Sequence, residues 1–156
     1  MGILVSGLLI LVLIAALICA ICGVFCHKNG QGSQLKLWSA LILVGISGGL
    51  ATVVLHYEQS YATAEQTFMT IFKETYQNFK DVKRVQRFEH MDAKQKRKLY
   101  QKTKRIARES YLNSKVIMQH AINEMNENKT LFRLQDYHHA KQAQKLLQEQ
   151  YDELTH

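Results

Sequence analysis

Residues 38–57 read WSALILVGISGGLATVVLHY. The run is apolar and uncharged, and its length matches the roughly 20 helical residues that cross a hydrocarbon core. Trp38 begins it and His56 and Tyr57 end it, as aromatic residues do at the level of lipid headgroups. The stretch therefore predicts a transmembrane helix. No helix breaker follows, because Gly49 is the last glycine and the chain has no proline.

A first apolar run precedes this one. Residues 2–26 contain no charged side chain, and they exceed the length that a membrane span needs. No lysine or arginine stands before the run, whereas a secretory signal begins with basic residues, so we expect the helix to be retained. Turn-forming and polar residues occupy positions 27–36. Together these features predict a transmembrane hairpin over residues 1–57, with spans at 2–26 and 37–56.

The remainder, residues 58–156, is polar. Past residue 56 the chain carries all 13 acidic and 18 of the 20 basic side chains. Apolar residues recur there at helical spacings of three and four, and this pattern predicts helices over 58–89, 93–126 and 130–154. The expected fold is thus an all-α membrane protein whose second span continues into a three-helix bundle or a coiled-coil hairpin.

Local residues indicate where these helices begin. Asp92 can cap the second helix, with Gln95 at the capping-box position three residues later. Thr130 or Asn128 can cap the third.

Small residues recur four apart in the second span, and such faces let helices approach closely in lipid. Two explanations stand: packing within the hairpin, or self-association between protomers. The candidate packing residues are Gly45, Ser47, Gly48, Gly49, Ala51 and Thr52.

A strongly basic region forms the most distinctive polar feature. If the first two polar helices are antiparallel, its members gather at one end of the domain, furthest from the membrane. We call this set the basic end. It comprises Lys80, Lys83, Arg84, Arg87, Lys94, Lys96, Arg97, Lys98, Lys102, Lys104, Arg105 and Arg108.

The basic end has three interpretations. It could be a solvated helix face, neutralised in part by neighbouring subunits or by Glu149, Asp152 and Glu153. It could dock an acidic protein or an anionic polymer. Nucleic acid is the third partner class, and it is disfavoured because no aromatic residues alternate with the charges and no nucleic-acid-binding signature occurs.

Motifs of catalysis and metal binding are missing from the sequence. It contains no phosphate-binding loop, no HExxH and no GxSxG. Cys19, Cys22 and Cys26 lie inside the first span, where ionising a thiol is costly. His138 and His139 are adjacent and point about 100° apart on a helix. We therefore expect no enzymatic activity, no metal and no cofactor.

Charges near the spans predict the orientation. The 27–36 loop carries Lys28 and Lys36, whereas the flank after the second span is slightly acidic. Because positive loops face the cytoplasm, both termini should lie outside, which is the periplasm if the protein resides in a bacterial inner membrane.

These observations favour a non-enzymatic, membrane-anchored helical scaffold or accessory subunit. Its partners would be membrane lipids and the proteins of a homo- or hetero-oligomeric membrane complex, which the basic end would contact. An alternative is an oligomeric pore former of holin or toxin type. A third hypothesis, a membrane tether for nucleic acid, requires the opposite topology.

Overall fold

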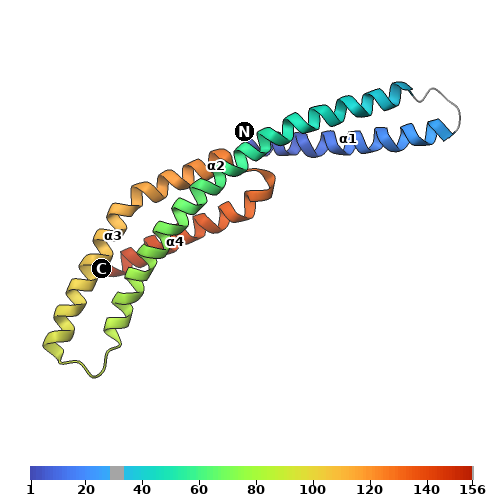
Figure 1. Cartoon of the computed structure of the whole chain (residues 1–156). Coiled ribbons are helices and arrows are strands. Elements are labelled where there is room, and N and C mark those ends of the chain that lie inside the picture. The colour runs from blue at the N-terminus through green and yellow to red at the C-terminus, as the bar shows by residue number, and fades with distance from the viewer. Residues whose placement is uncertain (29–33, 156) are drawn as a thin grey trace. The chain divides into compact units, whose positions relative to one another are not determined.

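The computed structural model of the protein describes residues 1–28 and 34–155, and within these ranges every regular element is a helix. In chain order these are α1 (Gly2–Lys28), α2 (Gln34–Gln86), α3 (Ala93–Asn128), the short 3-10 helix η1 (Leu131–Arg133) and α4 (Leu134–Thr155), as Figure 1 shows. The predicted all-α class is confirmed. Within the predicted 27–36 loop, residues 29–33 lie outside the described ranges.

The chain packs into two compact units. Unit 1 contains residues 1–60 and 127–134, and unit 2 contains residues 61–126 and 135–156. Helix α2 contributes residues to both. The sequence predicts a boundary between residues 57 and 58, whereas the units divide at residue 60 and the 127–134 segment belongs with the N-terminal part of the chain.

Unit 1 holds the two apolar segments. Residues 2–24 and the part of α2 that begins at Trp38 are long and apolar enough to cross a membrane. Only 11% of the most apolar window of each is buried inside the protein, so neither is the core helix of a globular domain. Polar side chains within the α2 segment bond to its own backbone: the Ser47 and Thr52 hydroxyls donate to carbonyls three residues earlier.

Unit 2 is a helical bundle built from residues 61–86 of α2 together with α3 and α4. Its core joins aromatic side chains of α2 to aliphatic and methionine side chains of α3 and α4. The largest of the fully buried side chains are Tyr61, Phe68, Phe79, Met118, Met125 and Leu147. Their burial supplies most of the stability of a bundle of this kind.

Pairwise contacts give the direction of the helices in unit 2. Thr75 bonds to Ser114 and Asn78 bonds to Ser110, so α2 and α3 run antiparallel. Between α3 and α4, Gln119 bonds to Gln144, and Tyr111 stacks on Tyr151 with ring centroids 4.6 Å apart. These two helices are therefore also antiparallel (Figure 1).

The connection between α2 and α3 contains the predicted helix cap in its second half. Helix α2 ends at Gln86 rather than at residue 89. Hydrogen bonds that span three residues tighten its last turn, such as the one from the Arg87 N–H to the Arg84 carbonyl (3.1 Å). The Asp92 carboxylate then accepts from the Gln95 N–H at 3.3 Å. The prediction that Asp92 caps α3 is confirmed.

The connection between α3 and α4 differs from the expectation. Helix α3 extends to Asn128, past the predicted end at residue 126. Thr130 stands at the capping position before η1, but its side chain makes no capping hydrogen bond. The hydroxyl donates instead to the Glu58 carboxylate, a charged acceptor that forms a stronger hydrogen bond than a neutral group.

Candidate functional site

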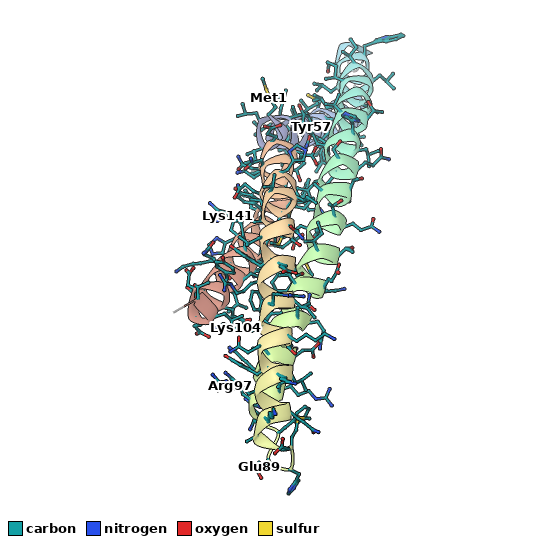
Figure 2. All side chains as sticks on the ribbon, turned by 90° about the vertical axis from the view of Figure 1, so that its left-hand side faces the viewer. Met1, Tyr57, Glu89, Arg97, Lys104 and Lys141 are labelled. Carbon is teal, nitrogen blue, oxygen red and sulfur yellow. The ribbon has the colours of Figure 1, made fainter. Side chains whose placement is uncertain are left out.

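The basic end lies at one end of unit 2. Because α2 and α3 are antiparallel and are joined by residues 87–92, the last turns of α2 and the first turns of α3 are neighbours. Figure 2 shows Glu89, Arg97 and Lys104 along this end. Helix α2 enters the unit at Tyr61, at the opposite end of the bundle.

Ten of the twelve side chains of the basic end are exposed, and Lys96 and Lys104 are half-buried. Lys94, Lys98 and Arg105 follow one another at spacings of four and seven, which places them on one face of α3. Ala107 and Tyr111, which are buried, lie on a different face of the same helix. These three charges therefore form a stripe that points away from the core.

Few acidic groups neutralise the basic end. Lys83 Nζ lies 3.4 Å from Glu153, and Arg105 Nε lies 3.5 Å from Glu109. In the described part of the chain the other ten basic groups form no ion pair. Both pairs are largely exposed, and such pairs contribute only about 0–1 kcal/mol each. The basic end thus keeps most of its positive charge.

The acidic groups expected to neutralise the basic end are mostly occupied elsewhere. Glu153 reaches Lys83, but Glu149 pairs with Lys145 at 3.6 Å and Asp152 accepts a hydrogen bond from Gln148 at 2.8 Å. A shallow groove also runs along α3 within the basic end. Its lining combines four basic groups with one acidic and two uncharged residues: Lys102, Lys104, Arg105, Arg108, Glu109, Gln101 and Leu112.

The predicted small-residue face divides into two. Ser47 and Val54 are buried and Ala51 is half-buried, so this side of α2 packs within unit 1. Gly45, Gly48, Gly49 and Thr52 lie elsewhere on the helix: Thr52 is exposed, and a methyl group added at any of the three glycines would meet nothing within 4 Å. The glycines therefore do not mediate the packing of α2 inside the chain.

A second polar site, which the sequence did not reveal, joins three distant segments of unit 1. We call it the junction, and its members are Ser6, Glu58, Thr130, Leu131 and Arg133. The Leu131 N–H donates to the Ser6 hydroxyl at 3.1 Å, and Ser6 donates to the Ile3 carbonyl at 3.0 Å. Arg133 Nε donates to Glu58 at 2.7 Å, and the Thr130 hydroxyl donates to the other oxygen of that carboxylate.

The junction is protected from solvent. Ser6 and Thr130 are fully buried, and the side chains of Arg133 and Glu58 are 31% and 22% exposed. Gly2 lies close by, and a methyl group there would stand 2.7 Å from the Lys129 carbonyl oxygen. A carboxylate directly after an apolar span was the only sequence signal. It did not identify Arg133, which lies 75 residues further along the chain.

Metal-ligating side chains do not gather in the described ranges. No group of three or more His, Cys, Asp or Glu side chains there could hold a metal ion. Cys19 and Cys22 are free, and the His138 ring bonds to Gln142 at 3.0 Å.

Comparison with known proteins yields no relative. No protein-family model matches the chain, and neither a curated protein nor a solved structure is significantly similar to it.

Proposed function

We propose that this protein is a non-enzymatic, membrane-anchored helical scaffold whose unit 2 presents the basic end to an acidic partner. The observation that carries the proposal is a contrast in burial. Unit 2 buries a core of apolar side chains, although Leu112 and Val116 are exposed, whereas most large apolar side chains of unit 1 face outward, with Leu4, Val24 and Leu41 75%, 70% and 61% exposed. An apolar surface of this extent needs lipid or protein to cover it.

Lipid is the better cover because the spans hold no ionisable side chain between Gly2 and Val24 or between Trp38 and Leu55, apart from cysteine thiols. The junction supports a hairpin arrangement. Ser6 at the start of α1 and Glu58 after the second span both bond to the 130–133 segment, so the ends of the two spans meet there. Because the start of the first span lies beside the end of the second, the two spans would run in opposite directions.

The positive charge of the basic end supports an acidic protein or anionic polymer as the partner. A surface of one sign attracts ligands of the other and accelerates their association. The charge distribution beside the spans supports an orientation in which the C-terminal part lies outside the cytoplasm.

Charge reversal tests this function in the full-length protein reconstituted into vesicles. Lys94, Lys98 and Arg105 are replaced together by Glu, and binding of fluorescent poly-L-glutamate is measured. Three lost attractions of about 0.5–1 kcal/mol each should weaken binding roughly tenfold or more.

A matched variant replaces three lysines outside the basic end by Glu. The control residues are Lys115, Lys141 and Lys145. This variant should bind nearly as the wild type does, and the difference between the two should shrink at high salt. Equal weakening by both variants would mean that net charge, not the basic end, attracts the probe.

One observation favours a second function. The open glycine face of α2 is available to another protomer, as a laterally assembling pore former requires. Replacing Gly45 and Gly49 together by Leu should then abolish leakage from dye-loaded vesicles, whereas replacing the exposed Val44 and Val53 by Leu should not. If vesicles that carry the wild-type protein at high density do not leak dye, the pore-forming function is wrong.

A further inference from the structure

The segment that connects α3 to α4 carries an unusual apolar cluster. Residues 131–134 read LFRL and follow the polar run NENKT at 126–130. Leu131, Phe132 and Leu134 are 38%, 62% and 42% exposed. Connections between helices of a soluble bundle usually present polar groups, so three adjacent exposed apolar side chains need a cover.

Contacts with α1 place this cluster beside an apolar span. The Leu131 N–H bonds to Ser6, and Leu131 Cδ1 would lie 3.7 Å from a methyl group at Gly7. Both α1 residues belong to the segment that is apolar enough to cross a membrane, which begins at Gly2. At 1.5 Å per residue, η1 therefore lies alongside the first ~8 Å of that segment.

The charge within the cluster is neutralised. Arg133 is held by Glu58 at 2.7 Å, and Thr130 supplies a further hydrogen bond to the same carboxylate. A paired arginine that is mostly buried leaves Phe132 and its leucine neighbours as the outward groups of the connection. An apolar surface of this kind, with aromatic and leucine side chains, is typical of segments that enter the boundary between headgroups and acyl chains.

We propose that Leu131, Phe132 and Leu134 enter the interfacial layer of the same bilayer that α1 and α2 cross, as a third membrane contact of the protein. The inference rests on the proposed membrane anchoring. Lipid is the group that covers the cluster, because the cluster continues the apolar surface of α1 through the Leu131–Gly7 contact.

Fluorescence quenching by brominated phosphatidylcholine tests the contact in vesicles that contain the full-length protein. Trp38 is the only tryptophan of the chain and reports insertion of the span in the wild type. The variant that combines Trp38→Phe with Phe132→Trp moves the reporter to the cluster. Lipids brominated at shallow positions should quench it to an extent comparable with Trp38.

A matched control combines Trp38→Phe with Val116→Trp, which moves the reporter to a side chain of unit 2 that is 75% exposed. Bromolipid should leave its emission unchanged. Equal quenching of the reporters at 116 and 132 would overturn the inference, because the effect would not be specific to the cluster.

Trp38 of the wild type distinguishes failure of the membrane anchor from failure of the third membrane contact. If Trp38 is quenched and the reporter at position 132 is not, the membrane anchor stands and the third contact is wrong. A blue-shifted but unquenched reporter at 132 would mean that protein covers the cluster, which also overturns the inference. If Trp38 itself escapes quenching, the anchor and the contact both fail.

Discussion

Gly2 lies close to the connection between α3 and α4. A methyl group there would stand 2.7 Å from the carbonyl oxygen of Lys129 and 3.1 Å from that of Asn128. Both are backbone atoms, so they cannot rotate aside as a flexible side chain would. Gly7 has ordinary room, since its methyl group would lie 3.7 Å from Leu131 Cδ1.

We expect Gly2→Ala to destabilise the folded protein and Gly7→Ala to be neutral or stabilising. Overpacking at Gly2 should cost about 1–3 kcal/mol. At Gly7 the better helix propensity of alanine should add up to about 1 kcal/mol. Circular dichroism during heating in detergent compares the two variants. Equal unfolding temperatures would show that the close approach at Gly2 does not exist in solution.

Glu58 and Arg133 form the charged part of the junction. Removing either charge by a Gln substitution leaves its partner half-buried without its strongest hydrogen bond, and hydrogen bonds to charged groups contribute about 1.5–3 kcal/mol. We expect each single variant to be destabilised by about this amount, and the double variant by clearly less than the sum. Thermal unfolding of all three measures the coupling.

Glu89→Gln serves as the control for the junction, because Glu89 is exposed in the connection between α2 and α3. It should change stability by no more than about 0.5 kcal/mol. Additive losses in the Glu58 and Arg133 variants would mean that the two side chains do not interact.

At the scale of elements, Tyr111 links all three helices of unit 2. It contacts Phe79 of α2 with ring centroids 6.1 Å apart, stacks on Tyr151 of α4, and donates a hydrogen bond to Gln148. Burial raises the pKa of its phenol above the ordinary value of 10.0, and the negative charge of Asp152 and the Tyr151 phenol raise it further.

This shift predicts a loss of stability at alkaline pH. Well below pH 10.0 the phenol is protonated in both states, so its full contribution is present. As the pH rises further, the unfolded chain releases this proton first, and the stability contributed by Tyr111 is lost as the pH passes the raised pKa of the folded state.

Unfolding temperatures measured between neutral and strongly alkaline pH check the prediction. Tyr111→Phe should have a lower unfolding temperature at neutral pH, because it loses the hydrogen bond to Gln148, but a flatter decline above pH 10.0. An identical decline in both proteins would show that Tyr111 does not couple folding to pH.

At the scale of the whole molecule, the proposed orientation, with the C-terminal part of the chain outside the cytoplasm, can be tested by labelling of single cysteines. We expect a cysteine at Val116, in a chain whose native cysteines are replaced by serine, to react with an impermeant maleimide in intact cells. A cysteine at Gln31, in the loop predicted to be cytoplasmic, should react only after permeabilisation. The reverse pattern would contradict the proposed orientation and favour a partner inside the cell, nucleic acid included.

Much of the fold could be predicted from local sequence. Two uncharged apolar runs and the lack of proline determine the helices and the candidate spans, because hydropathy and backbone freedom act within a few residues. Asp92 as a cap and the composition of the basic end are equally local. These features depend on neighbours in the chain and need no knowledge of packing.

Tertiary structure alone decided the contacts between distant segments. Ser6 meets Leu131 across 125 residues, and Glu58 binds Thr130 across 72, so no local pattern could pair them. The same packing decided that the Thr130 hydroxyl bonds to Glu58 instead of capping a helix. It also decided that the described glycines of α2 are not covered by another helix. Periodicity identifies which residues share a face of a helix, but only the position of the other helices determines which face is covered.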